Sequence, residues 1–190
     1  RAIKGLLAAG ATYQVNYTFR LRAAFTGDPG DLFLRMAAGR QGLYGAFLRT
    51  DRWALLSASP ELFFRVDGEK AESRPMKGTA PRGPTLESDR RFASNLKQSE
   101  KTRAENIMIT DMVRNDMGRI ARMGSVRADA LFDIEAYPTL WQMTSTGTCV
   151  TDASIGGLFQ ALFPPASVTG APKPGTMKII QGGPAVPGID

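Results

Sequence analysis

A carboxylic acid at the start of an apolar run is the first candidate for chemistry. It is Glu61, in the segment SPELFF of residues 59–64. Pro60 fixes the backbone just before a predicted strand, and an apolar setting raises the pKa of a carboxyl group unless the group is paired. A carboxyl that keeps its proton near neutral pH suits a general acid. The alternative is an exposed glutamate that is paired with Arg65 or with a loop amide.

A lysine flanked by backbone-restricting residues is the second candidate. Lys77 lies in the segment RPMKGTAPRG of residues 74–83. The amides of Gly78 and Thr79, which follow it, are able to form an anion-binding turn. A lysine amine becomes a nucleophile when desolvation or a neighbouring cation lowers its pKa. The segment is therefore either a nucleophile beside an anion site or an ordinary surface loop.

A further carboxylate lies in a long predicted helix, residues 100–122. Glu105 flanks the apolar stripe of this helix, and Asp116 shares its face. A carboxylate beside apolar side chains must be paired or must bind a cation. Because the sequence has no histidine and no thiolate cluster, that cation would be a hard, oxygen-liganded ion such as Mg²⁺. The alternative is a buried ion pair with an arginine.

A second loop rich in glycine, proline and hydroxyl groups spans residues 164–175. Ser167, Thr169 and Gly170 lie in it, directly before a predicted helix. Free amides at a helix N-terminus bind carboxylates or phosphates. The alternative is that this segment is an ordinary connection from a loop into a helix. The spacing does not match the phosphate-binding loop of nucleotide triphosphatases.

The composition limits the chemistry further. The 190-residue chain has no histidine and one cysteine, Cys149. These counts exclude histidine-based triads, histidine-ligated zinc and an internal disulfide framework, and they fit a reducing cytoplasm. Hydrophobic residues make up 43% of the chain and charged residues 22%, which is typical of a folded globular protein.

The basic net charge of +6 points to no particular macromolecule. Lysine and arginine are spread along the chain rather than clustered with aromatic residues, so we expect no nucleic-acid partner; a positive field also suits a small anionic substrate. No apolar run approaches the roughly 20 residues of a membrane span, and the first residues do not resemble a signal peptide. The sequence predicts a cytoplasmic protein with no membrane partner.

Hydrophobic periodicity predicts the elements that position these residues. A run of strands followed mainly by helices predicts an α+β fold. The predicted strands cover residues 13–22, 43–49, 53–58, 62–67, 70–74, 125–133 and 138–150. The predicted helices cover residues 1–10, 30–38 with a stop at Gly39, 87–97, 100–122, 154–162 and a last helix from about 174, and the segments 75–84 and 164–175 are predicted to be loops.

Five segments resemble, in order, the chorismate-utilising enzyme family. They are AGATYQVNYT (9–18), SASPELFF (57–64), RPMKGTAPRG (74–83), SEKTRAENIMITDMVRNDMGRI (99–120) and FPPASVTGAPKPGTMKII (163–180). The resemblance covers residues 1 to about 181. It implies two packed, mainly antiparallel β-sheets flanked by helices, with the site between them.

Three positions distinguish the branches of this family. Lys77 stands where anthranilate synthases usually carry alanine, and a lysine there resembles the aminodeoxychorismate synthase branch. Gln14 stands where the isochorismate- and salicylate-forming members carry a water-activating lysine, so ammonia is the implied nucleophile. Gln142 stands where anthranilate synthases have a histidine. The anthranilate synthase branch is the enzymatic alternative.

The resemblance implies a mechanism on chorismate. Lys77 adds to the ring while Glu61 protonates the departing hydroxyl, and ammonia from a separate glutamine amidotransferase subunit then displaces the lysine. The product, 4-amino-4-deoxychorismate, serves para-aminobenzoate and folate synthesis. Glu105 resembles a ligand of the family's Mg²⁺. The residues that map to substrate-binding segments are Gln14, Gly78, Thr79, Ser167, Thr169 and Gly170.

Family members continue beyond the segment that ends near residue 181, and they have a longer amino-terminal region. We therefore expect residues 1–181 to be part of a chorismate-binding catalytic domain, incomplete at both ends, and residues 182–190 to be a divergent Gly/Pro-rich tail. Such a piece alone would lack part of the anion- and metal-binding set. A catalytically incompetent scaffold or association module is the non-enzymatic alternative.

Overall fold

The computed structural model describes residues 2–38 and 44–181. Its helices are α1 (Ala2–Ala8), α2 (Pro29–Ala38), α3 (Leu86–Gln98), α4 (Glu100–Gly118), α5 (Ile155–Leu162), α6 (Ala166–Thr169) and α7 (Lys173–Gln181). Its strands are β1 (Gln14–Val15), β2 (Tyr44–Arg49), β3 (Ala54–Ser59), β4 (Leu62–Asp67), β5 (Lys70–Arg74), β6 (Met76–Pro81), β7 (Arg127–Ala136), β8 (Leu140–Val150) and β9 (Gly170–Ala171). The fold is α+β with antiparallel sheets flanked by helices, as predicted.

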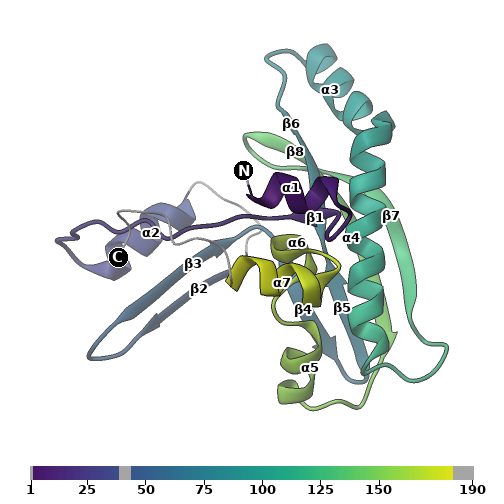
Figure 1. Cartoon of the computed structure of the whole chain (residues 1–190). Coiled ribbons are helices and arrows are strands. Elements are labelled where there is room, and N and C mark those ends of the chain that lie inside the picture. The colour runs from purple at the N-terminus through teal and green to yellow at the C-terminus, as the bar shows by residue number, and fades with distance from the viewer. Residues whose placement is uncertain (1, 39–43, 182–190) are drawn as a thin grey trace.

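The long strand β8 organises the main sheet, which has five strands (Figure 1). β7 pairs with one edge of β8, while β5 and β6 pair one after the other with its opposite edge. Pro75 separates β5 from β6, and its carbonyl accepts a hydrogen bond from the Ser145 amide of β8 at 3.2 Å. Residues 70–81 therefore follow β8 as one nearly continuous, antiparallel partner.

Helices α3 and α4 pack against this sheet near β6 and β8. Both begin with a hydroxyl cap: Thr85 accepts a hydrogen bond from the Ser88 amide, and Ser99 accepts one from the Thr102 amide. Such caps satisfy amides that have no partner inside the helix. The buried side chains of α4 are Asn106, Ile109, Thr110, Val113, Asp116 and Met117.

An ion pair fixes α3 to the edge of the sheet. Arg82, just after β6, donates to both carboxylate oxygens of Asp89 in α3, and Trp141 of β8 donates its indole N–H to the same carboxylate at 2.8 Å. These contacts hold the pKa of Asp89 well below its usual range, chiefly through the hydrogen bonds from Arg82. The carboxylate therefore remains charged and holds this end of β6 in place.

The hydrophobic core lies between α4, α5 and the lower part of the sheet. Its buried members are Ala71, Val113, Met117, Cys149, Leu158, Ala161 and Leu162. Burial raises the pKa of the Cys149 thiol, so this cysteine packs as a small apolar side chain. In the part of the chain that the structure describes, no helix has the length and apolar character needed to cross a membrane.

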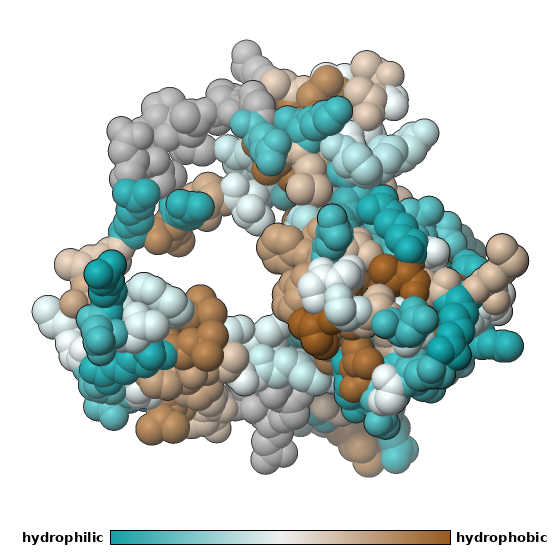
Figure 2. Space-filling view, turned by 90° about the horizontal axis from the view of Figure 1, so that it is seen from below, coloured by the Kyte–Doolittle hydropathy of each residue, from teal (hydrophilic) through white to brown (hydrophobic). Residues whose placement is uncertain are grey.

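A separate arm consists of α2 and the hairpin of β2 and β3. Phe33 of α2 stacks on Phe47 of β2 at 5.6 Å between ring centroids. Figure 2 shows open space between this arm and the rest of the molecule, with apolar residues on both sides of it. Leu34 and Leu48 are 65% and 54% exposed, so the arm carries apolar surface that the described residues do not cover.

Four sequence predictions need correction. Three of them failed because strand formation depends on whether a distant partner strand is present. The predicted strand 13–22 pairs only at Gln14–Val15, because residues 16–22 have no partner strand among those described. The predicted loop 75–84 contains β6, and the predicted loop 164–175 contains α6 and β9, because these segments pair with distant strands. The predicted helix 100–122 ends at Gly118. The predicted stop at Gly39 and the tail 182–190 lie outside the described residues.

A glycine is required where α4 and α3 approach β6. Gly78 has a φ of +103°, and a Cβ there would lie 2.1 Å from Thr102 Cγ2 and 3.3 Å from Leu96 Cδ1. A side chain at this position would therefore push the two helices away from the sheet. The segment Lys77–Thr79 keeps its place on β6 because residue 78 has no side chain.

We predict that Gly78→Ala lowers the free energy of unfolding by about 2–5 kcal/mol, because overpacking and positive-φ strain add. Urea denaturation measures the loss. Gly68→Ala is the matched control: Gly68 has a φ of +58° and nothing within 4 Å of a Cβ, so only about 1–2 kcal/mol of strain is expected. Equal losses at both positions would contradict the close helix–sheet approach.

Candidate active site

The strand register places Glu61 beside Lys77. Leu62 at the start of β4 pairs with Arg74 at the end of β5, so Glu61 lies opposite the start of β6. The Met76 amide donates a hydrogen bond to Glu61 Oε1 at 3.3 Å, and Met76 directly precedes Lys77. Two candidates from separate segments are thus brought together. Arg65, the alternative partner for Glu61, forms an ion pair with Glu72 instead.

The environment of Glu61 favours its protonated form. Burial raises the pKa of this carboxyl above its ordinary value, because the charged form loses solvation. Ser167, the Met76 amide and the positive charge of Lys77 lower the pKa in part, but burial outweighs them. This direction of the pKa shift is the one that a general acid requires.

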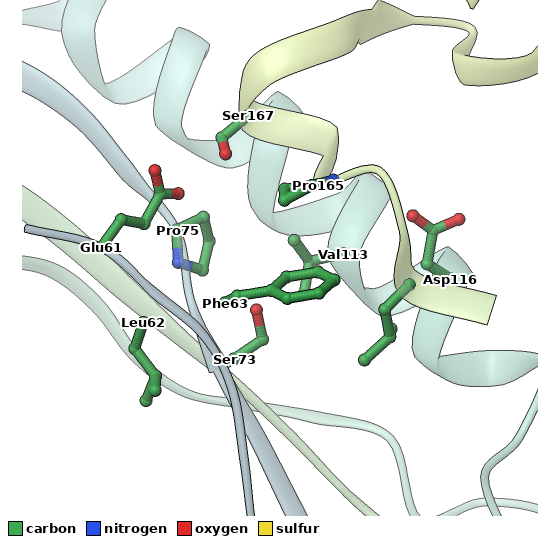
Figure 3. Close-up of a pocket in the computed structure, with 10 residues that line it drawn as sticks. Glu61, Leu62, Phe63, Ser73, Pro75, Val113, Asp116, Pro165 and Ser167 are labelled. Carbon is green, nitrogen blue, oxygen red and sulfur yellow. The ribbon is translucent and has the colours of Figure 1, made fainter. Parts of the chain in front are cut away.

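Ser167 faces Glu61 from the opposite side of a small cavity (Figure 3). The cavity has about 20 Å³ of free space, room for about one water molecule. Leu62, Phe63, Val113 and other apolar residues form much of its wall. Within the described residues the buried Ser167 Oγ has no hydrogen bond of standard geometry, although it lies close enough to Glu61 to lower the pKa of the carboxyl.

The segment with Ser167, Thr169 and Gly170 is joined to Gln14 by the short β1–β9 ladder. Gln14 pairs with Ala171 and Val15 pairs with Gly170. A Cβ at Gly170 would lie 2.1 Å from the Gln14 carbonyl oxygen, so only glycine permits this approach.

Asn16 extends the connection from Gln14 to Ser167. The Gln14 side-chain amide donates to Asn16 Oδ1 at 3.3 Å, and Asn16 Nδ2 donates to the Ser167 carbonyl at 3.1 Å. The Asn16 backbone amide also donates to the Thr169 carbonyl at 2.8 Å. Segments 12–16 and 167–171 therefore form one unit next to Glu61.

Thr79 lies further along β6. Its hydroxyl donates to Gln142 Oε1 of β8 at 2.8 Å, as the pairing of these two residues in the register allows. Gln142 is one of the positions that distinguish the branches of the family. It contacts Thr79, a residue expected to bind substrate. Gly78 and Thr79 adjoin Lys77 in the chain, so the three share one stretch of β6.

Comparison with known proteins is consistent with this geometry. Residues 1–182 match the family described as chorismate binding enzyme. The chain belongs to this family. Aminodeoxychorismate synthase component 1 of Escherichia coli is 41% identical over 183 residues, which are 95% of this chain and 40% of that protein. Anthranilate synthase component 1 1 of Haloarcula marismortui is 36% identical, over 95% of this chain and 37% of that protein.

The fold is also that of solved structures. Anthranilate synthase component I from Streptococcus pneumoniae superimposes with a TM-score of 0.83 at 26% identity, over 94% of this chain and 40% of that one. The isochorismate synthase MenF of Escherichia coli, at 15% identity and a TM-score of 0.70, shares the fold. The chain spans 40% and 37% of the length of the two curated relatives named above.

The Glu105 carboxylate has no hydrogen bond or ion pair within the described ranges 2–38 and 44–181. It is half-buried on α4, one residue before Asn106, which donates to the Lys77 carbonyl at 3.4 Å. Those ranges contain no group of three acidic, cysteine or histidine side chains placed to hold a metal. Mg²⁺ often takes only one or two protein carboxylates and completes its shell with water and substrate oxygens. An unpaired Glu105 fits the role of one such ligand.

Some residues of the site had no distinctive sequence signal. Asn16 and Asn106 hold the backbones of Ser167 and Lys77, yet an isolated asparagine predicts nothing by itself. Asp116 is buried in an ion pair, as one alternative allowed, but its partner is Lys173 and not an arginine. Only the three-dimensional contact identifies this partner, since the two residues are far apart in the chain.

We predict that Glu61→Gln raises the stability of the protein at pH 7. A carboxyl whose pKa is raised on folding binds its proton more tightly in the folded state, so stability falls as pH rises from the unfolded pKa of about 4.3 through the folded pKa. Glutamine carries no charge and removes this loss. Thermal unfolding should show a higher midpoint for Glu61→Gln at pH 7 and no difference below about pH 4.

The control is Glu87→Gln. Glu87 is exposed in the first turn of α3, where a negative charge is favourable, so its removal should lower the midpoint slightly. A lower midpoint for Glu61→Gln at pH 7 would show that the Glu61 carboxylate is stabilised, rather than disfavoured, by its surroundings.

Proposed function

We propose that the protein containing this chain is the component of aminodeoxychorismate synthase that aminates chorismate. The observation that carries the proposal is the placement of Lys77 beside Glu61, with a cavity and Ser167 next to the carboxyl. Relatives that are 41% and 43% identical carry the name aminodeoxychorismate synthase, which supports this branch of the family. The implied product is 4-amino-4-deoxychorismate, a precursor of para-aminobenzoate and folate.

In the proposed first step, the amine of Lys77 forms a bond to ring carbon 2 of chorismate. The ring double bonds shift, the bond between carbon 4 and its hydroxyl breaks, and Glu61 supplies the proton with which that group leaves as water. The nitrogen of Lys77 gives up its proton on forming the new bond, and Glu61 is reprotonated. The raised pKa of Glu61 supports its role as the acid.

In the second step, ammonia bonds to carbon 4, the double bonds shift back and the Lys77–carbon bond breaks. The proton that the ammonia nitrogen loses is taken up by the departing Lys77 nitrogen, which restores the amine. Chorismate and ammonia thereby give aminodeoxychorismate and water. Gln14 near this segment has an uncharged amide, which cannot act as a base toward water; this supports ammonia as the nucleophile. A glutamine amidotransferase subunit is the proposed source of ammonia, in the cytoplasm.

Glu105 would be one ligand of a Mg²⁺ ion. When bound, the ion would neutralise the ring carboxylate of chorismate. The amides of Gly78 and Thr79 and the hydroxyls of Ser167 and Thr169 are proposed to position the substrate around Lys77. The backbone of Gly170 at β9 then keeps this segment against Gln14.

Anthranilate synthase is the second candidate, because a relative of that name is 36% identical. The two activities differ in product: anthranilate synthase releases anthranilate and pyruvate, whereas the proposed enzyme retains the side chain of chorismate. Lys77 and Gln142 favour the first candidate, because anthranilate synthases usually have alanine and histidine at these two positions.

We predict that the native full-length protein, given chorismate, Mg²⁺ and ammonium, forms aminodeoxychorismate, and that Lys77→Ala lowers kcat by at least about 100-fold because a covalent step is lost. Liquid chromatography with mass spectrometry identifies the product. Lys101→Ala, an exposed lysine of α4, is the control and should retain activity. Formation of anthranilate would assign the second candidate; full activity of Lys77→Ala would remove the proposed nucleophile.

A further inference from the structure

Asp116 lines the cavity on the far side from Glu61 (Figure 3) and forms a buried ion pair with Lys173. Lys173 Nζ donates to Asp116 Oδ2 at 2.7 Å and to the Leu162 carbonyl at 3.0 Å. The side chains of Lys173 and Asp116 are 9% and 6% exposed. The proposed mechanism uses neither residue.

The position of these contacts in the chain is distinctive. Leu162 ends α5 and Lys173 begins α7. The ammonium group of the residue that follows the segment 163–172 therefore contacts the carbonyl of the residue that precedes it. Asp116 lies on α4 and attaches that closed loop to the helix that packs on the sheet. We call Asp116, Lys173 and the Leu162 carbonyl the clamp.

The loop closed by the clamp is the one that carries Ser167, Thr169 and Gly170. Further polar attachments of this loop run to segment 12–16, through Tyr13, Asn16 and their neighbours. Among the described residues, the ion pair of the clamp is the charged contact that attaches this loop to α4. The distance between Ser167 and Glu61 therefore depends on where the clamp holds the loop.

Stability alone does not explain a buried ion pair here. Removing two charges from water costs free energy, and apolar side chains of similar volume often serve a core equally well or better. What apolar side chains cannot do is donate to the Leu162 carbonyl and fix the loop in one position.

We propose that Asp116 and Lys173 are positioning residues that hold the loop 163–172 so that Ser167 faces Glu61 across the cavity. The inference rests on the proposed role of Glu61 as the acid. It adds that catalysis depends on a charged contact that touches neither substrate nor the reacting atoms, and that this contact acts through Ser167.

The test is a mutant cycle in the native full-length protein. The double variant Asp116→Leu with Lys173→Met removes the clamp but keeps an apolar core, so its thermal midpoint should stay near that of the wild type. Its kcat should fall by about 100-fold, since a displacement of about 1 Å has an effect of this size. Asp111→Leu with Arg114→Met is the matched control, because it removes an exposed ion pair of the same helix and should leave kcat unchanged.

Ser167→Ala completes the cycle. It should lower kcat in the wild-type background but change it by less than about twofold when the clamp is absent, because both changes remove the same contact. A merely structural role predicts effects that multiply. The proposal would be overturned if the double variant without the clamp kept the kcat of the wild type. It would also be overturned if Ser167→Ala lowered kcat by the same factor with and without the clamp.

Two further measures keep the result decisive. If the double variant does not fold, the cycle is repeated with Asp116→Asn, which keeps an oxygen acceptor for Lys173. The rate is followed as loss of chorismate, which does not depend on the product formed. A product other than aminodeoxychorismate would then contradict the proposed function, while the cycle still decides the role of the clamp.

Discussion

The antiparallel register of β4, β5 and β6 is the constraint on which the site depends. Because Leu62 pairs with Arg74, the residue before β4 must lie opposite the residues that begin β6. The Met76 amide then reaches the carboxylate of Glu61, and Lys77 follows in the next position. β8 holds this arrangement in place, since it pairs with both β5 and β6.

The same placement creates an electrostatic conflict. The apolar wall of the cavity disfavours the charged form of Glu61, while Lys77 and Ser167 favour it. Burial prevails, and the protein keeps a carboxyl group in a setting that lowers its stability at neutral pH. Strained or unfavourable groups of this kind are characteristic of functional sites.

Local sequence patterns were sufficient for much of the fold. The 3.6-residue pattern predicted α3 and most of α4, and hydrophobic periodicity predicted four strands of the main sheet, β4, β5, β7 and β8. Predictions failed where structure depends on distant partners. The sequence of β6 has the glycine and prolines of a loop, yet it becomes a strand because β8 lies beside it.

The candidate site shows the same division. Glu61 and Lys77 were identified from their own segments, because a carboxyl or amine among prolines, glycines and apolar residues is unusual. The residues that hold the segments of the site together were not predicted: Asn106, Asn16 and Lys173 are connected to the site only by folding. Tertiary hydrogen bonds leave no local periodicity, so sequence patterns do not reveal them.

The claim that Lys77 is a nucleophile is central to this account, and mass spectrometry of the modified lysine tests it most directly. The native protein is incubated with chorismate and Mg²⁺ without ammonia, quenched in acid and digested. The account predicts that the peptide containing Lys77 gains the mass of chorismate less one water, and that added ammonium removes this modification. Conversion of chorismate with ammonium while the Lys77 peptide stays unmodified under both conditions would contradict the account.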